Sequence, residues 1–216
     1  MGVINQKNYN NQMSLNNLLS AALMTLVAAT MPATADDSYQ THCAHCHGAT
    51  GEGNDTLGAP NLTRLSESYI ERQLQGFKKD WRSKDNHYTQ SMTAAIASLD
   101  TPTLKSATTA ISRLPDGKVM SQAAKNGDVA RGKDLYTAYC GACHGTRANG
   151  NDALGAPNLL GLSSDYLTRQ YREFAKGKRG THPNDKYGQQ MARLSKALKD
   201  PQLIDDVTAY VVSIAE

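Results

Sequence analysis

Two short motifs of cysteine and histidine dominate the chemistry available to this chain of 216 residues. Each reads Cys-x-x-Cys-His, at residues 43–47 and again at residues 140–144, and together they use all four cysteines. Two thiols one helical turn apart are spaced to form thioether bonds to the vinyl groups of a haem, and the next histidine is then placed to bind its iron. We therefore predict two covalently bound haem c groups, with His47 and His144 as iron ligands. The predicted attachment residues are Cys43, Cys46, Cys140 and Cys143.

Other sites built from cysteine fit this pattern less well. A zinc site would bring the two Cys-x-x-Cys units closer together in the sequence and gives no reason for a histidine directly after each. A redox-active or disulfide-bonded Cys-x-x-Cys does not need the histidine either. Covalent haem attachment is the reading that uses every residue of both motifs.

The motifs belong to an internal duplication. At an offset of 97 positions, residues 53–55 repeat at 150–152 as Gly-Asn-Asp, and residues 57–62 repeat at 154–159 as Leu-Gly-Ala-Pro-Asn-Leu. The second copy then gains two residues, and the offset becomes 99. A repeat that runs through most of each copy indicates a duplicated domain rather than two chance motifs.

We expect an all-α fold of two tandem domains, at residues 36–114 and 128–216, joined by a linker at 115–127. Apolar residues recur at helical spacing, and no useful run alternates as a strand would. Each copy is too small to bury a generous core alone, so an inserted haem should supply apolar surface for folding. Periodicity and capping residues place helices at 68–78, 102–113, 128–140, 165–176 and 201–214.

The ligand on the other side of each iron decides what that iron can do. Met92 and Met191 occupy equivalent positions in the two copies. A thioether is a soft ligand, and Met/His ligation raises the reduction potential of a haem. Two alternatives stay open at this point: the methionines fill gaps in the core, or a histidine such as His87 or His182 binds instead. These two histidines, however, are not equivalent in the repeat.

Residues around the motifs suggest how the ligands are held. Gly lets the backbone approach the haem closely, and Pro60 or Pro157 is placed to direct a carbonyl, its own or the preceding one, toward the histidine N–H. Arg72 and Arg169 are candidates for contacts to haem carboxylates, or are simply solvated helix residues.

Residues 1–35 are predicted to be a secretory signal peptide. An apolar run at 18–29 precedes a small-x-small cleavage site that ends at Ala35, and the start is Met1 or Met13. The alternative is a retained membrane anchor. Export predicts a periplasmic protein that meets the membrane only through its partners. The net charge of +3 excludes the strongly basic surface of a nucleic-acid-binding protein.

The residues also resemble a known family. Tandem Cys-x-x-Cys-His motifs, the Gly-Ala-Pro-Asn-Leu loop, a Tyr-x-x-x-Gln helix and a late methionine look like the dihaem cytochrome c4 family, whose domains are class I cytochrome c domains. The dihaem subunit of flavocytochrome c sulfide dehydrogenase is similar in plan. The resemblance implies proximal ligands His47 and His144, distal ligands Met92 and Met191, and two domains packed about a pseudo-twofold axis. The first copy departs from the pattern in its shortened leading helix.

The resemblance implies a dihaem electron carrier and not an enzyme. Its redox partners would be a quinol-oxidising complex or a dehydrogenase as donor, and a terminal oxidase or reductase as acceptor. One alternative is a cytochrome subunit that takes electrons from a bound flavoprotein dehydrogenase. The other is a dihaem peroxidase or thiosulfate-oxidising enzyme, which would need an open or displaceable iron position.

Overall fold

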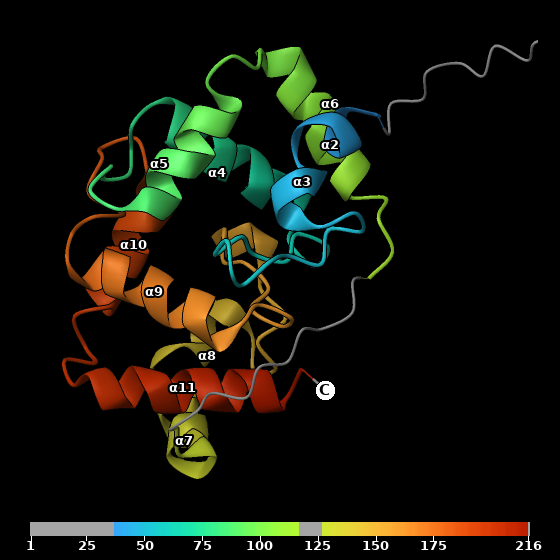
Figure 1. Ribbon diagram of the computed structural model, residues 1–216. Coiled ribbons are helices and arrows are strands. Elements are labelled where there is room, and N and C mark those ends of the chain that lie inside the picture. Colours follow the sequence, from blue (N-terminus) through green and yellow to red (C-terminus); the bar gives the residue numbers. More distant parts are fainter. Residues whose placement is uncertain (1–36, 117–126, 216) are drawn as a thin grey trace, which may run out of the picture. The chain divides into compact units, whose positions relative to one another are not determined.

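The computed structural model describes residues 37–116 and 127–215 (Figure 1). The predicted signal peptide and most of the predicted linker lie outside these residues. The described residues form helices, two isolated β-bridges and no strand, so the predicted all-α fold is confirmed. None of the helices within these ranges is both long and apolar enough to cross a membrane.

The two copies repeat one order of helices. The first copy, blue to green in Figure 1, contains α2 (Asp37–His42), α3 (Ala44–His47), α4 (Glu67–Lys78), α5 (His87–Ile96) and α6 (Thr101–Ile111). The second copy, yellow to red, contains α7 (Val129–Tyr139), α8 (Gly141–His144), the short 3₁₀ helix η1 (Asp152–Leu154), α9 (Ser164–Ala175), α10 (Lys186–Leu194) and α11 (Pro201–Ser213).

Side-chain caps fix where these helices begin. The hydroxyl of Ser66 accepts a hydrogen bond from the backbone N–H of Tyr69 at the start of α4, and Ser163 does the same for α9. Carboxylates cap the last helix of each copy, from Asp100 for α6 and Asp200 for α11. The predicted helices at 68–78, 165–176 and the two copy ends are therefore found within one or two residues. Helices α5 and α10 were not predicted.

Corresponding helices pack in the same way in both copies. Helix α6 packs against α2 and α4, and α11 packs against α7 and α9. A buried tyrosine lies in the core of each copy. The hydroxyl of Tyr39 donates a hydrogen bond to the carbonyl of Gly48 at 2.6 Å, and that of Tyr136 donates to the carbonyl of Gly145 at 2.7 Å. Both carbonyls directly follow a motif histidine, so the core fixes the end of each motif.

Reciprocal arginine contacts join the two copies. Arg72 donates through Nη2 to the carbonyl of Gly155 at 2.7 Å, and Arg169 donates to Gly58 at 2.7 Å. Arg72 also lies 4.5 Å from the ring centre of Tyr187, a residue of the second copy. Both arginines therefore bind the opposite copy, a role that differs from the solvated position considered from sequence. Such an exchange of equivalent contacts is what a twofold relation between the copies produces.

Candidate functional site

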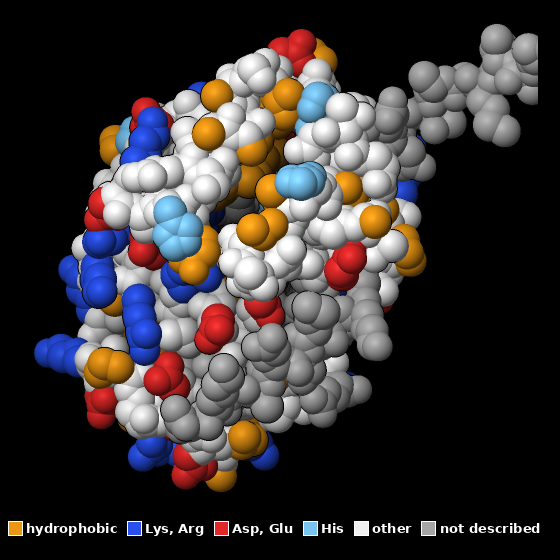
Figure 2. All heavy atoms as spheres, in the orientation of Figure 1, with side chains coloured by type: hydrophobic (Ala, Val, Ile, Leu, Met, Phe, Trp, Pro, Cys, Tyr) orange, Lys and Arg blue, Asp and Glu red, His pale blue; other side chains and the backbone are white. Residues whose placement is uncertain are grey.

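Each copy encloses one cavity, and each cavity is lined by one complete set of the predicted site residues. The first set is Cys43, Cys46, His47 and Met92, and the second set is Cys140, Cys143, His144 and Met191. The first cavity has a volume of about 360 Å³ and the second a volume of about 160 Å³. Figure 2 shows a hollow with hydrophobic side chains between α5 and α3, which both contribute to the first cavity.

The two motif histidines are held in one orientation by the same backbone contact. The Nδ1 atom of His47 lies 3.0 Å from the carbonyl oxygen of Pro60, and that of His144 lies 3.0 Å from Pro157. With Nδ1–H donating to the carbonyl, Nε2 is the unprotonated nitrogen and is free to bind a metal. Burial lowers the pKa of both imidazoles, which favours this neutral form, although the carbonyl contact acts in the opposite direction.

Glycine makes this contact possible. Gly53 has a φ of +90°, and a Cβ there would lie 2.6 Å from the backbone nitrogen of Asn61. Gly150 has a φ of +84° and the same crowding against Asn158. A side chain at either position would push away the segment that carries the proline carbonyl. The prediction that Gly-rich turns bring Pro60 and Pro157 to the histidines is confirmed.

The cysteines are half-buried, unpaired thiols. All four are free of disulfide bonds. Burial, with a smaller effect from the neighbouring cysteine, raises the pKa of Cys43 to about 11 and that of Cys140 to about 12. A redox-active dithiol requires a lowered thiol pKa, so these motifs do not resemble one. In the part of the chain that the structure describes, no group of three or more His, Cys, Asp or Glu is arranged to hold a metal ion.

The methionines come from the two helices that sequence analysis missed. Met92 lies on α5 and Met191 on α10, and each lines the cavity that holds the histidine of its own copy. The spare histidines do not share this symmetry. His87 lines the first cavity, whereas the ring of His182 is stacked on Trp81 with 5.3 Å between centroids.

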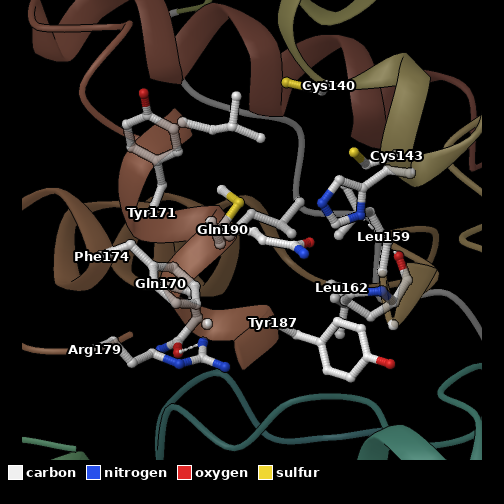
Figure 3. A pocket seen from close by; sticks show the side chains of 18 of the residues that line it. Cys140, Cys143, Leu159, Leu162, Gln170, Tyr171, Phe174, Arg179, Tyr187 and Gln190 are labelled. Carbon is white, nitrogen blue, oxygen red and sulfur yellow. Dashed lines mark hydrogen bonds between the residues drawn. The ribbon is translucent and has the colours of Figure 1, made fainter. Parts of the chain in front are cut away.

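The second cavity has distinct ends. In Figure 3, Cys140 and Cys143 lie at one end of the cavity and Arg179 lies at the other, hydrogen-bonded to Gln170. Mostly apolar and aromatic side chains, among them Phe174, form the walls between. This cavity suits a covalently attached haem. The two thiols can bind its vinyl groups, the imidazole nitrogen and the thioether can bind its iron, and the cationic end can face its carboxylates.

Two pairs of residues at these sites were missed from sequence. They are Tyr39 with Tyr136, beside the motifs, and Arg82 with Arg179, at the cationic ends of the cavities. Both pairs obey the offset of 97. Extending the repeat comparison to every identical pair would have found them.

The sequence and the fold both match known proteins. Residues 33–107 and 129–215 match the family described as cytochrome c. A thiosulfate dehydrogenase electron acceptor of Stutzerimonas stutzeri is 28% identical over 180 residues, which are 81% of this chain and 79% of that protein. Cytochrome c-554(547) of Halothiobacillus neapolitanus is 32% identical over 91 residues, 41% of this chain and 98% of that protein.

Solved structures agree with the two-domain architecture. Cytochrome c4 of Acidithiobacillus ferrooxidans aligns with a TM-score of 0.65 and 24% identity, covering 81% of this chain and 99% of that chain. Thiosulfate dehydrogenase (TsdBA) of Marichromatium purpuratum gives the same score and identity, but the alignment covers 36% of that chain. The predicted fold of two tandem cytochrome c domains is confirmed.

Proposed function

The chain belongs to the cytochrome c family, and on that premise we propose that it carries single electrons between protein partners in the bacterial periplasm. It is a cytochrome c4-like electron carrier with two covalently attached haem c groups, one in each domain. The relatives are electron carriers or electron acceptors, in agreement with the prediction that this chain is not an enzyme. The domain boundaries that we propose remain 36–114 and 128–216.

When bound, haem iron supplies a one-electron redox couple. The residues of this chain would hold the same ligands on the iron in both oxidation states. We propose that His47 and His144 bind the irons through Nε2, each oriented by its proline carbonyl. Met92 and Met191, which line the same cavities, would supply the second protein ligand of each iron. Because both irons would then hold six ligands in either oxidation state, electron transfer would need little rearrangement and no small substrate would reach the metal.

The observation that carries this proposal is the repeated, complete donor set of the two cavities. A methionine that only filled space would not need a histidine and two cysteines around the same cavity in both copies. The test is a set of single variants, Met92→Ala, Met191→Ala and His87→Ala, with absorption spectra of the oxidised proteins. We expect each methionine variant to remove about half of the long-wavelength band typical of Met–iron ligation, and His87→Ala to leave it intact.

Loss of the band in His87→Ala, or its full retention in both methionine variants, would refute the ligand assignment. Intact mass under denaturing conditions is the control, because both haems must still be attached for the comparison to hold. A methionine variant should also lower one reduction potential and leave the other nearly unchanged.

We propose a dehydrogenase or a quinol-oxidising complex as donor, and a terminal oxidase or reductase as acceptor. The relative named as a thiosulfate dehydrogenase electron acceptor supports a dehydrogenase of inorganic sulfur compounds as the first donor to test. Oxidised protein, mixed with a purified thiosulfate dehydrogenase and thiosulfate, should become reduced in both haems. The protein alone should not oxidise thiosulfate. Turnover by the protein alone would support the enzyme alternative instead.

Export is part of the same proposal. We propose that residues 1–35 are removed and that the mature protein begins at Asp36. N-terminal sequencing of haem-stained protein from a periplasmic extract tests this, and a retained leader in the membrane fraction would contradict it.

A further inference from the structure

The two cavities meet at a small group of shared side chains, which we call the junction. Five residues line both cavities: Tyr69, Gln73, Tyr166, Gln170 and Arg179. Arg179 is the charged member of this group, and its side chain is buried, with 6% of the residue exposed. A buried cation is expensive unless it has hydrogen bonds and a counter-charge, so Arg179 needs an explanation.

The hydrogen bonds of Arg179 span the two copies. Its Nη1 donates to Oε1 of Gln170 in its own copy at 2.5 Å, and its Nη2 donates to Oε1 of Gln73 in the first copy at 2.6 Å. The guanidinium also stacks on Phe174, 4.3 Å from the ring centre. These contacts fix the group between the cavities but supply no negative charge.

The equivalent residue of the first copy is placed differently. Arg82 donates to the same oxygen of Gln73 and stacks on Phe77, yet it lines the first cavity only. Burial and the like charge of Arg179 lower the pKa of Arg82 to about 10. The ion pairs found among the described residues do not include either arginine. Two cations therefore approach each other through one glutamine. The carboxylate of Asp185 favours the charged form of both arginines, but neither is in an ion pair found among the described residues.

A bound haem would bring two further carboxylates to these arginines. A haem carries its two carboxylates on the edge opposite the two vinyl groups, so attachment at Cys140 and Cys143 directs the carboxylates toward the far end of the cavity. Arg179 lies at that end (Figure 3). In the first cavity, Arg82 holds the position in the repeat that Arg179 holds in the second, and both arginines line that cavity, so the same reasoning from Cys43 and Cys46 applies there.

We propose that Arg179 is a shared counter-ion for the carboxylates of both haems, so that one side chain sets both reduction potentials, whereas Arg82 acts on the first haem alone. A cation beside a haem favours the reduced iron, which carries one positive charge fewer. The duplication thus leaves two similar haems with unequal surroundings, because one of the two equivalent arginines faces both cavities. This inference rests on the haem placement proposed above.

The test is a redox titration, followed by absorbance, of the full protein and its Arg179→Gln, Arg179→Lys and Arg82→Gln variants. The two couples are assigned with Met92→Ala and Met191→Ala. We expect Arg179→Gln to lower both potentials, each by a tenfold or larger change in its equilibrium constant, about 59 mV for one electron. Arg82→Gln, the matched control, should lower only the potential of the first haem.

Arg179→Lys keeps the positive charge but loses the planar guanidinium group. Both reduction potentials of this variant should therefore lie closer to those of the parent protein than to those of Arg179→Gln. A role in packing alone would not be rescued by lysine. The proposal is overturned if Arg179→Gln or Arg179→Lys shifts the second couple alone, or if Arg179→Gln leaves both couples unchanged while intact mass shows two haems. Unchanged potentials in a protein with two haems would refute the role of Arg179 but not the proposed function as an electron carrier. Failure of this inference is therefore distinguishable from failure of the proposed function.

Discussion

The reciprocal contacts of Arg72 and Arg169 predict how strongly the two domains are coupled. Each arginine donates a charged hydrogen bond to a glycine carbonyl of the other domain, which is worth about 1.5–3 kcal/mol. Each also lies over a tyrosine of the other domain, which adds about 0.5–1 kcal/mol. Replacing either arginine by alanine should therefore cost about 2–4 kcal/mol, and replacing both about 4–8 kcal/mol.

Because a domain is stable by only about 5–15 kcal/mol, the double variant should lose the cooperativity between the domains. The assay is guanidinium unfolding followed by circular dichroism and by haem absorbance. We expect one transition for the parent protein and two separated transitions for Arg72→Ala/Arg169→Ala. Arg113→Ala, an exposed arginine on the first domain, is the control and should behave as the parent. A double variant with the midpoint and slope of the parent would refute the reasoning.

Three further substitutions test the supports of the second domain. Tyr136→Phe removes a buried hydroxyl that donates to a carbonyl, and should lower the free energy of unfolding by about 1–2 kcal/mol in urea titrations. Gly150→Ala should cost at least about 2 kcal/mol, because φ is +84° there, and it should shift the potential of the haem bound by His144. The hydrogen bond from Arg131 holds the pKa of Asp206 below its usual value. The ionised carboxylate therefore adds fully to the free energy of unfolding above about pH 4, and this contribution is lost as pH falls through the pKa of the folded protein. Asp206→Asn should therefore lower the thermal midpoint at pH 7 and have progressively less effect in acid.

Local chemistry made much of the fold predictable. The caps at Ser66 and Ser163 have a side-chain oxygen three residues before the N–H that they accept from, and this is visible in sequence. The duplication added a second, independent copy of each signal. The helices that carry Met92 and Met191 were missed because they are only 10 and 9 residues long, although Asn86 and Asp185 cap them and their sequences show it. Helices of this length gain most of their stability from packing, here against α4 and α9.

The arrangement between the domains was beyond sequence reasoning for a different reason. Arg72 looks like any polar residue on a helix surface, and only the fold brings Gly155 within reach of it. The same holds for Arg179, whose two glutamine partners are 9 and 106 positions away. Contacts of this kind depend on the relative placement of whole domains, which no local pattern specifies.

We propose that one chain holds two electrons on two haems, each bound by a histidine and a methionine. An anaerobic reductive titration of the purified protein, followed by absorbance, measures this directly. We expect uptake of two electrons for each chain, with low-spin spectra from the fully oxidised to the fully reduced protein. Uptake of one electron, or a high-spin signal from either haem in the native protein, would contradict it.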